Sequence, residues 1–281
     1  MDQKIIKLFD GFTHGGMSRR EFLNRLTLLT GSSAAALTIL PLLENNYAKA
    51  DILPESDARI EANSYYWSGG SGYYVRPKVP SSYSSVMIIH ENRGLNPHIK
   101  DVARRLAIEG FKVFAPDYLS VFGGTPADPD KARDLIGKLT QEQILAFSKS
   151  ALEVTKFHRD GNGTAGAVGF CWGGSAVNAL AVAEKNLKAG VAYYGGQPPA
   201  ADVAKIKASL LLHYAGLDDR VDAGIPAFEA ALKAGHKNYE IHMYDGVNHA
   251  FNNDTNEARY DKSAADLAWG RTVAFLKKYL A

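Results

Sequence analysis

Six short apolar runs, separated by helical segments, constrain the fold of this chain more than any other feature. The runs occupy residues 84–91, 111–117, 164–170, 188–196, 208–216 and 239–246. The first of them, SSVMIIHE, is a short continuous apolar run, which is typical of a strand that is buried on both faces. Helical periodicity marks the segments between them; in one, Ile99, Val102 and Leu106 share a face. This alternation predicts an α/β fold, with a mostly parallel sheet covered by helices on both faces.

Residues 51–281 are expected to form a single domain. Two aromatic runs flank a Gly-Gly-Ser-Gly turn within residues 64–77, which predicts a β-hairpin ahead of the alternating region. No repeat and no internal linker interrupts residues 64–281. The net charge of +2 over 281 residues, without a long Lys/Arg block, argues against a nucleic-acid partner.

The chain contains one cysteine and eight histidines. A single cysteine excludes an intramolecular disulfide and a cysteine-rich zinc site. The histidines are scattered, without an HExxH pattern or a close pair flanked by carboxylates, so no metal site is expected. The chain also lacks a Walker loop and a GxGxxG at a strand–helix junction. We therefore expect neither a nucleotide nor another cofactor.

Residues 1–50 are predicted to be an export signal. Residues 18–23 read SRREFL, which resembles the twin-arginine signature of bacterial export signals. A moderately apolar segment follows at residues 26–43, and the sequence AKA at 48–50 resembles a cleavage site. The alternative is an amphipathic helix or a membrane anchor. If the signal is used, we expect the twin-arginine export machinery to be a partner and the bacterial periplasm to be the location. If it is not used, we expect the cytoplasm.

The only cysteine lies in an unusual setting, the stretch AVGFCWGGSA at residues 167–176. A Gly-x-Cys-x-Gly frame directly after an apolar strand indicates a nucleophile on a sharp strand-to-helix turn. The backbone N–H of Trp172, at the start of the helix, is then placed to join an oxyanion hole, and the helix N-terminus favours a thiolate. The alternative is that Cys171 is an inert buried thiol.

Polar residues follow the carboxyl ends of other predicted strands, where α/β sheets carry their chemistry. Asp218 and Asp219 follow one strand, and His249 follows the next within a Gly-Val-Asn loop. The order nucleophile, acid, histidine is that of α/β-hydrolases. His213 and His242 lie inside predicted strands, where we expect structural roles.

Several segments together resemble the dienelactone hydrolase family. They are MIIHENRGLNPHIKDVARRLA, FAPDYLS, VGFCWGG, YAGLDDRVDAGIPAFEAAL and YDGVNHAFNND, and the similarity spans roughly residues 60 to 281. The resemblance implies an α/β-hydrolase fold, with Cys171 as nucleophile, His249 as base and Asp218, by its Asp-x-x-Val pattern, as the residue that orients the base. It further implies that Glu91 contacts the resting thiol, and that the backbone N–H groups of Asn92 and Trp172 form the oxyanion hole.

The sequence departs from this family in its substrate-binding residues. Members that act on dienelactone carry two arginines that hold the substrate carboxylate, and Val121 and Asn253 stand at the matching places here. We therefore expect a small neutral or weakly acidic ester or lactone rather than dienelactone, although Arg93 could supply a charge. Five aromatic residues are candidates for lining an apolar pocket or for the core: Tyr118, Phe122, Trp172, Tyr194 and Phe251.

The leading hypothesis is thus hydrolysis of a small ester or lactone through a Cys-His-Asp triad and a thioester intermediate. A thiol enzyme acting on peptides or thioesters would use the same turn. The third alternative is an exported binding protein on a hydrolase scaffold, which need not retain all three triad members. The expected partner is a small-molecule ester or lactone, and the sequence does not indicate an oligomeric state.

Overall fold

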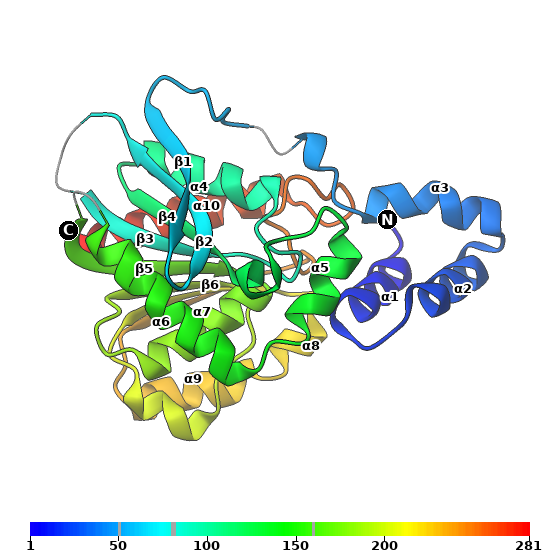
Figure 1. Ribbon diagram of the computed structural model, residues 1–281. Coiled ribbons are helices and arrows are strands. Elements are labelled where there is room, and N and C mark those ends of the chain that lie inside the picture. Colours follow the sequence, from blue (N-terminus) through cyan, green and yellow to red (C-terminus); the bar gives the residue numbers. More distant parts are fainter. Residues whose placement is uncertain (50–51, 80–82, 159–160) are drawn as a thin grey trace.

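The computed structural model describes residues 1–49, 52–79, 83–158 and 161–281 (Figure 1). The predicted cleavage point between Ala50 and Asp51 lies outside the described residues. An eight-stranded sheet forms the centre of the described chain. Its strands are β1 (Ile60–Trp67), β2 (Gly70–Pro77), β3 (Tyr83–Ile89), β4 (Lys112–Asp117), β5 (Gly161–Phe170), β6 (Ala189–Tyr193), β7 (Ser209–Ala215) and β8 (Tyr239–Tyr244).

The strand order across the sheet is β1-β2-β4-β3-β5-β6-β7-β8. β1 and β2 form the predicted hairpin, and β2 pairs antiparallel with β4. All other neighbouring strands are parallel, so their carboxyl ends lie at one edge of the sheet. The predicted α/β fold, with its mostly parallel sheet, is confirmed.

Helices cover both faces of the sheet. They are α4 (Pro97–Ile108), α5 (Pro129–Ile136), α6 (Gln141–Phe157), α7 (Trp172–Ala183), α8 (Asp219–Asp222), α9 (Ile225–Ala234) and α10 (Lys262–Leu280), with short 3₁₀ turns at Tyr118–Phe122 and Ala200–Lys205. The last helix begins at Lys262. A turn precedes it, and the side chain of Asp261 accepts a hydrogen bond from the N–H of Ala264 as its N-cap.

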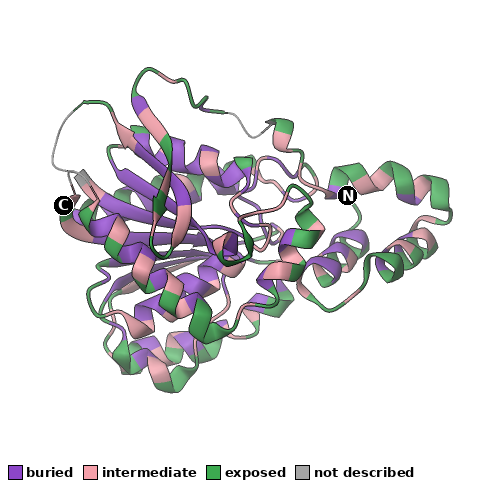
Figure 2. Ribbon diagram, in the orientation of Figure 1, coloured by how far each residue is buried: buried purple, intermediate pink, exposed green. Residues whose placement is uncertain are grey.

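Successive residues of each central strand enter different cores. In β3, Val86 and Ile88 pack in the cluster that includes α4 and α10, whereas Met87 and Ile89 pack in the cluster that includes α6, α7 and α9. Figure 2 shows the buried strands between helices whose outer faces are exposed. This alternation explains why Val86–Ile89 is apolar at every position.

Residues 1–49, predicted as an export signal, are folded in the structure. They form α1 (Gln3–His14), α2 (Arg19–Thr30), α3 (Ser33–Leu43) and a 3₁₀ turn at Tyr47–Lys49, and we call them the N-terminal cap. The cap lies beside α5 and α8 in Figure 1. Its own small core contains Phe9, Phe12, Phe22 and Leu26. The cap therefore meets the hydrolase domain with a packed structure rather than as an extended tail.

Hydrogen bonds and ion pairs attach the cap to the hydrolase domain. Asn256 donates to the Leu43 carbonyl at 2.6 Å, and Arg259 pairs with Asp10 at 2.9 Å. No single helix in the described residues has the length and apolar character to cross a membrane. Helices α2 and α3 reach those criteria only as a pair, which is bent by 114°.

Candidate active site

Cys171 occupies a sharp turn between β5 and α7. Its backbone angles, φ 57° and ψ −114°, lie in a region that residues with a side chain rarely adopt. Glycines make the turn possible, because a Cβ at Gly169 would collide with the Gly173 carbonyl and one at Gly173 with the Ile89 carbonyl. The strained turn brings Cys171 to the carboxyl edge of the sheet, where it lines a pocket.

His249 and Asp218 form a hydrogen-bonded pair at the same edge. Nδ1 of His249 donates to Oδ2 of Asp218 at 2.5 Å, and the two side chains are only 2% and 5% exposed. Asp219, the other carboxylate that the sequence offered, is 80% exposed and pairs with Lys7 of the cap. The geometry therefore makes Asp218, not its neighbour, the partner of His249.

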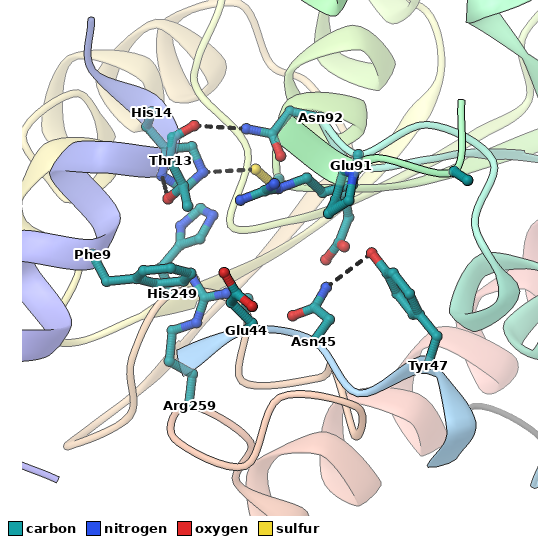
Figure 3. Close-up of a pocket in the computed structure, with 15 residues that line it drawn as sticks. Phe9, Thr13, His14, Glu44, Asn45, Tyr47, Glu91, Asn92, His249 and Arg259 are labelled. Atoms are coloured by element: carbon teal, nitrogen blue, oxygen red, sulfur yellow. Dashed lines mark hydrogen bonds between the residues drawn. The ribbon is translucent and has the colours of Figure 1, made fainter. Parts of the chain in front are cut away.

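A second histidine, which belongs to the cap, contacts the thiol. Nε2 of His14, the last residue of α1, lies 3.1 Å from Sγ of Cys171 (Figure 3). Nδ1 of His14 lies 2.9 Å from the Thr13 hydroxyl and 3.1 Å from the Asp10 carbonyl, and it donates to the carbonyl, because a carbonyl can only accept. In the neutral ring Nε2 is then the acceptor for the thiol proton. The His14 and His249 rings lie 4.6 Å apart, centre to centre.

The two imidazoles differ in acid–base character. Burial, together with the charge of His249, lowers the pKa of His14 well below its usual value. Burial also lowers the pKa of His249, but the neighbouring Cys171 and Asp218 outweigh this effect and raise that pKa to about 10. Burial raises the pKa of Asp218, yet its hydrogen bond to His249 outweighs burial and lowers the pKa overall. His14 is therefore a neutral acceptor, whereas His249 is the stronger base.

Glu91 lies in the pocket but does not hold the thiol. Its carboxylate oxygens accept from Nδ2 of Asn253 at 3.2 and 3.4 Å, and both side chains are buried. Among the described contacts the thiol bonds to His14, whereas the resemblance implies a contact with Glu91. The partner of Glu91 in the structure is therefore Asn253 rather than the thiol.

The two residues expected to supply oxyanion donors flank the thiol in the fold. Trp172 is the first residue of α7, so its N–H has no acceptor inside the helix. Asn92 follows Glu91 after β3, and its side chain donates to the Thr13 carbonyl of the cap at 2.9 Å. This hydrogen bond places the end of α1 against the segment that would hold an oxyanion.

The pocket that contains Cys171 and His249 has a volume of about 260 Å³. The cap supplies part of its wall with Phe9, Thr13, His14, Glu44, Asn45 and Tyr47 (Figure 3). The hydrolase domain supplies Glu91, Asn92, Arg93, Ala127, Pro129, Cys171, His249, Ala250 and Arg259. A segment predicted to be separate from the fold therefore encloses the pocket.

The five aromatic residues that the sequence offered as pocket candidates do not line this pocket. Tyr118, Tyr194 and Phe251 are core residues, while Phe122 is largely exposed and Trp172 packs against both cores. The aromatic rings in the wall are instead Phe9 and Tyr47 of the cap. The sequence interpretation missed them because residues 1–50 had been assigned to an export signal.

Comparison with known proteins places most of the chain in one family. Residues 71–280 match the dienelactone hydrolase family, and residues 1–30 match a YqhI-like family. A protein of Saccharolobus solfataricus named "Putative carboxymethylenebutenolidase" is 30% identical over 260 residues, with 78% of this chain and 99% of that protein covered. Protein usf of Aquifex pyrophilus is 33% identical over 218 residues, covering 74% and 93%.

A solved structure supports the same grouping. A crystal structure titled "Putative Dienelactone Hydrolase" from Klebsiella pneumoniae superposes with a TM-score of 0.71 at 27% identity. The alignment covers 78% of this chain and 99% of that one.

Proposed function

This chain belongs to the dienelactone hydrolase family, and from that premise we propose that it hydrolyses a small ester or lactone through Cys171, His249 and Asp218. A fold hosts many activities, so the proposal depends on the site. The observation that carries it is the convergence in one pocket of a thiol on a strained turn and a histidine whose Nδ1 is held by a buried carboxylate.

In the first half-reaction the thiol of Cys171 gives up its hydrogen bond to His14 and transfers its proton to Nε2 of His249. The thiolate attacks the carbonyl carbon, and the carbonyl electron pair moves onto oxygen. The N–H groups of Trp172 and Asn92 would donate to that oxygen, and one such donor contributes about 3–4 kcal/mol. Collapse breaks the ester C–O bond, the alkoxide takes the proton from His249, and a thioester remains.

Water completes the cycle in the second half-reaction. His249 accepts a proton from water, and the hydroxide attacks the thioester. The C–S bond breaks to release the acid, and the departing thiolate takes the proton from His249, which restores Cys171. Asp218 holds Nδ1 throughout, which keeps Nε2 directed at the reacting atoms and stabilises the imidazolium.

The charges around the pocket favour a neutral substrate. Arg93 pairs with Asp130, and Arg259 pairs with Asp10, so both pocket cations already have carboxylate partners. Of the two positions where the family carries substrate-binding arginines, Val121 is exposed and Asn253 bonds to Glu91. A pocket of about 260 Å³ is at the small end for ligand sites, which suits a short acyl group or a small lactone.

The test is turnover of short-chain aryl esters and a small lactone by the full-length protein and by Cys171→Ala. We expect hydrolysis by the wild type, a thioester on Cys171 detectable by mass spectrometry, and a loss of about 1,000-fold or more in the variant. Equal hydrolysis by both proteins would contradict the assignment of the nucleophile. Tight binding without turnover would instead favour a binding protein, and turnover of thioesters or peptides alone would favour that class of substrate.

We also propose that residues 1–50 direct export by the twin-arginine route to the bacterial periplasm. The support is the SRREFL sequence, in which Arg20 is exposed while Arg19 pairs with Asp130 and Glu44. Replacing both arginines by lysine is expected to move the protein from the periplasmic to the cytoplasmic fraction of an expressing bacterium. An unchanged distribution would show that these residues serve only the folded cap.

A further inference from the structure

Three potential metal ligands from distant parts of the chain converge at the thiol. His14 ends the first cap helix, Cys171 precedes α7, and His249 lies in the loop after β8. One ligand atom from each residue lies within 4.8 Å of the other two. The closest pair is Nε2 of His14 and Sγ of Cys171, at 3.1 Å. Neither the proposed hydrolysis nor the family resemblance requires His14 at this position.

The surroundings of both imidazoles are those of metal ligands. Metal-binding histidines almost always donate their other ring nitrogen to a carboxylate or a backbone carbonyl. His249 donates Nδ1 to the Asp218 carboxylate, and His14 donates Nδ1 to the Asp10 carbonyl. Nε2 of His249 is buried and has no hydrogen-bond partner among the described residues. Each ring is therefore oriented by its Nδ1, which leaves Nε2 to face the pocket.

From this arrangement we propose that His14, Cys171 and His249 bind a zinc ion in the closed form of the protein. The closed form is the one in which the N-terminal cap is retained and lies over the pocket. One thiolate and two imidazoles are the donors that Zn²⁺ prefers, whereas Mg²⁺ and Ca²⁺ prefer oxygen. Three protein ligands leave a fourth position, which lies toward the pocket and can hold water. No metal site is predicted from the sequence here, because the three ligands are 157 and 78 positions apart along the chain.

The distances require only a small adjustment. Bond lengths of about 2.0–2.3 Å put the ligand atoms of a tetrahedral zinc site roughly 3.5 Å apart. The His14–Cys171 pair is already closer than this, and the upper limit of 4.8 Å exceeds it by little more than 1 Å.

Zinc binding would switch the hydrolase off. The S–H bond is exchanged for an S–Zn bond, one proton leaves to solvent, and the two Nε2 lone pairs complete the protein ligands without any electron transfer. The nucleophile and the base are then both occupied. Because His14 belongs to the cap and the other two ligands to the hydrolase domain, the ion also fixes the cap over the pocket. The site thus couples metal concentration to access to the thiol.

Cobalt substitution tests the site without relying on hydrolysis. Full-length protein freed of metal with a chelator is titrated with Co²⁺, which reports a thiolate ligand by charge-transfer absorption, and zinc affinity follows by competition. We expect one ion per chain, and no charge-transfer band in Cys171→Ser. Zinc affinity should fall at least about 100-fold in His14→Gln and in His249→Asn, since even the loss of an outer partner costs 10- to 100-fold.

Controls separate this result from surface binding and from unfolding. His236→Asn removes an exposed histidine in a turn and is expected to leave zinc affinity unchanged. Hydrogen exchange of α1 shows whether the cap stays folded in His14→Gln and in a second variant, His14→Asn. Zinc affinity is then judged from the variant in which α1 exchanges as in the wild type. Unchanged affinity in that variant, or binding without a thiolate band, would overturn the three-ligand site. Either outcome is independent of whether esters are hydrolysed.

Discussion

Asp218→Asn is expected to lower kcat for ester hydrolysis by about 1,000-fold or more, the largest effect that we predict for a change that leaves the thiol in place. Asp218 accepts the Nδ1 proton of His249 at 2.5 Å, and its negative charge contributes to the raised pKa of that imidazole. A neutral amide neither fixes the required tautomer nor stabilises the imidazolium. Steady-state kinetics with the best ester of the panel provides the measurement.

The chain contains a matched control one residue away. Asp219→Asn removes the same charge from an exposed side chain whose partner is Lys7, so kcat should stay within about twofold of the wild type. If the two variants lost activity equally, the loss would come from removing a negative charge anywhere in this loop rather than from the orientation of His249. A loss confined to Asp219→Asn would contradict the assignment of the acid.

Phe12→Ala is expected to raise the rate at which iodoacetamide alkylates Cys171 by about 100-fold. Phe12 is buried in the cap core, stacks on Phe22 with 4.6 Å between ring centres and lies under the Arg133 guanidinium. Truncating a buried phenylalanine costs about 3–5 kcal/mol. If about 3 kcal/mol of this loss weakens docking of the cap, the fraction of molecules with the cap undocked rises about 100-fold. In the closed form Cys171 is only 6% exposed.

The matching control is Leu28→Ala, at an α2 side chain that is 83% exposed. It changes the same helical cap without touching its core, so the alkylation rate should not change. Hydrogen exchange should show α1 deprotected in Phe12→Ala while β5 and α7 remain protected. Faster exchange of α1 without faster alkylation would mean that the cap does not shield the thiol.

Most of the hydrolase domain could be predicted because its signals are local. Each central strand feeds two cores, so apolar residues run continuously through Val86–Ile89 and its counterparts, and the helices between them keep one apolar face. The turn around Cys171 was recognisable for the same reason: only glycine fits at positions 169 and 173, and both lie within two residues of the thiol. Where the sequence determines structure over a few residues, prediction and structure agree.

The cap side of the site could not be predicted in this way. His14 meets a cysteine 157 positions further along the chain, and a lone histidine at a helix end has no local pattern that marks it. One signal was present: Ile5, Phe9 and Phe12 form an apolar stripe at helical spacing ahead of the arginine pair, where a signal has no need of one. The SRREFL sequence outweighed that stripe in the interpretation.

The attachment of the cap also determines the order in which the chain can assemble. Residues 1–49 leave the ribosome before their partners, which include Thr255, which accepts from Asn46, and Asn256 and Arg259, which bind Leu43 and Asp10. The cap can dock only after nearly the whole chain has been synthesised. Until then the apolar faces of the cap are accessible to other proteins in the cell. Elongation time therefore sets the period in which these apolar faces can be recognised, before folding buries them.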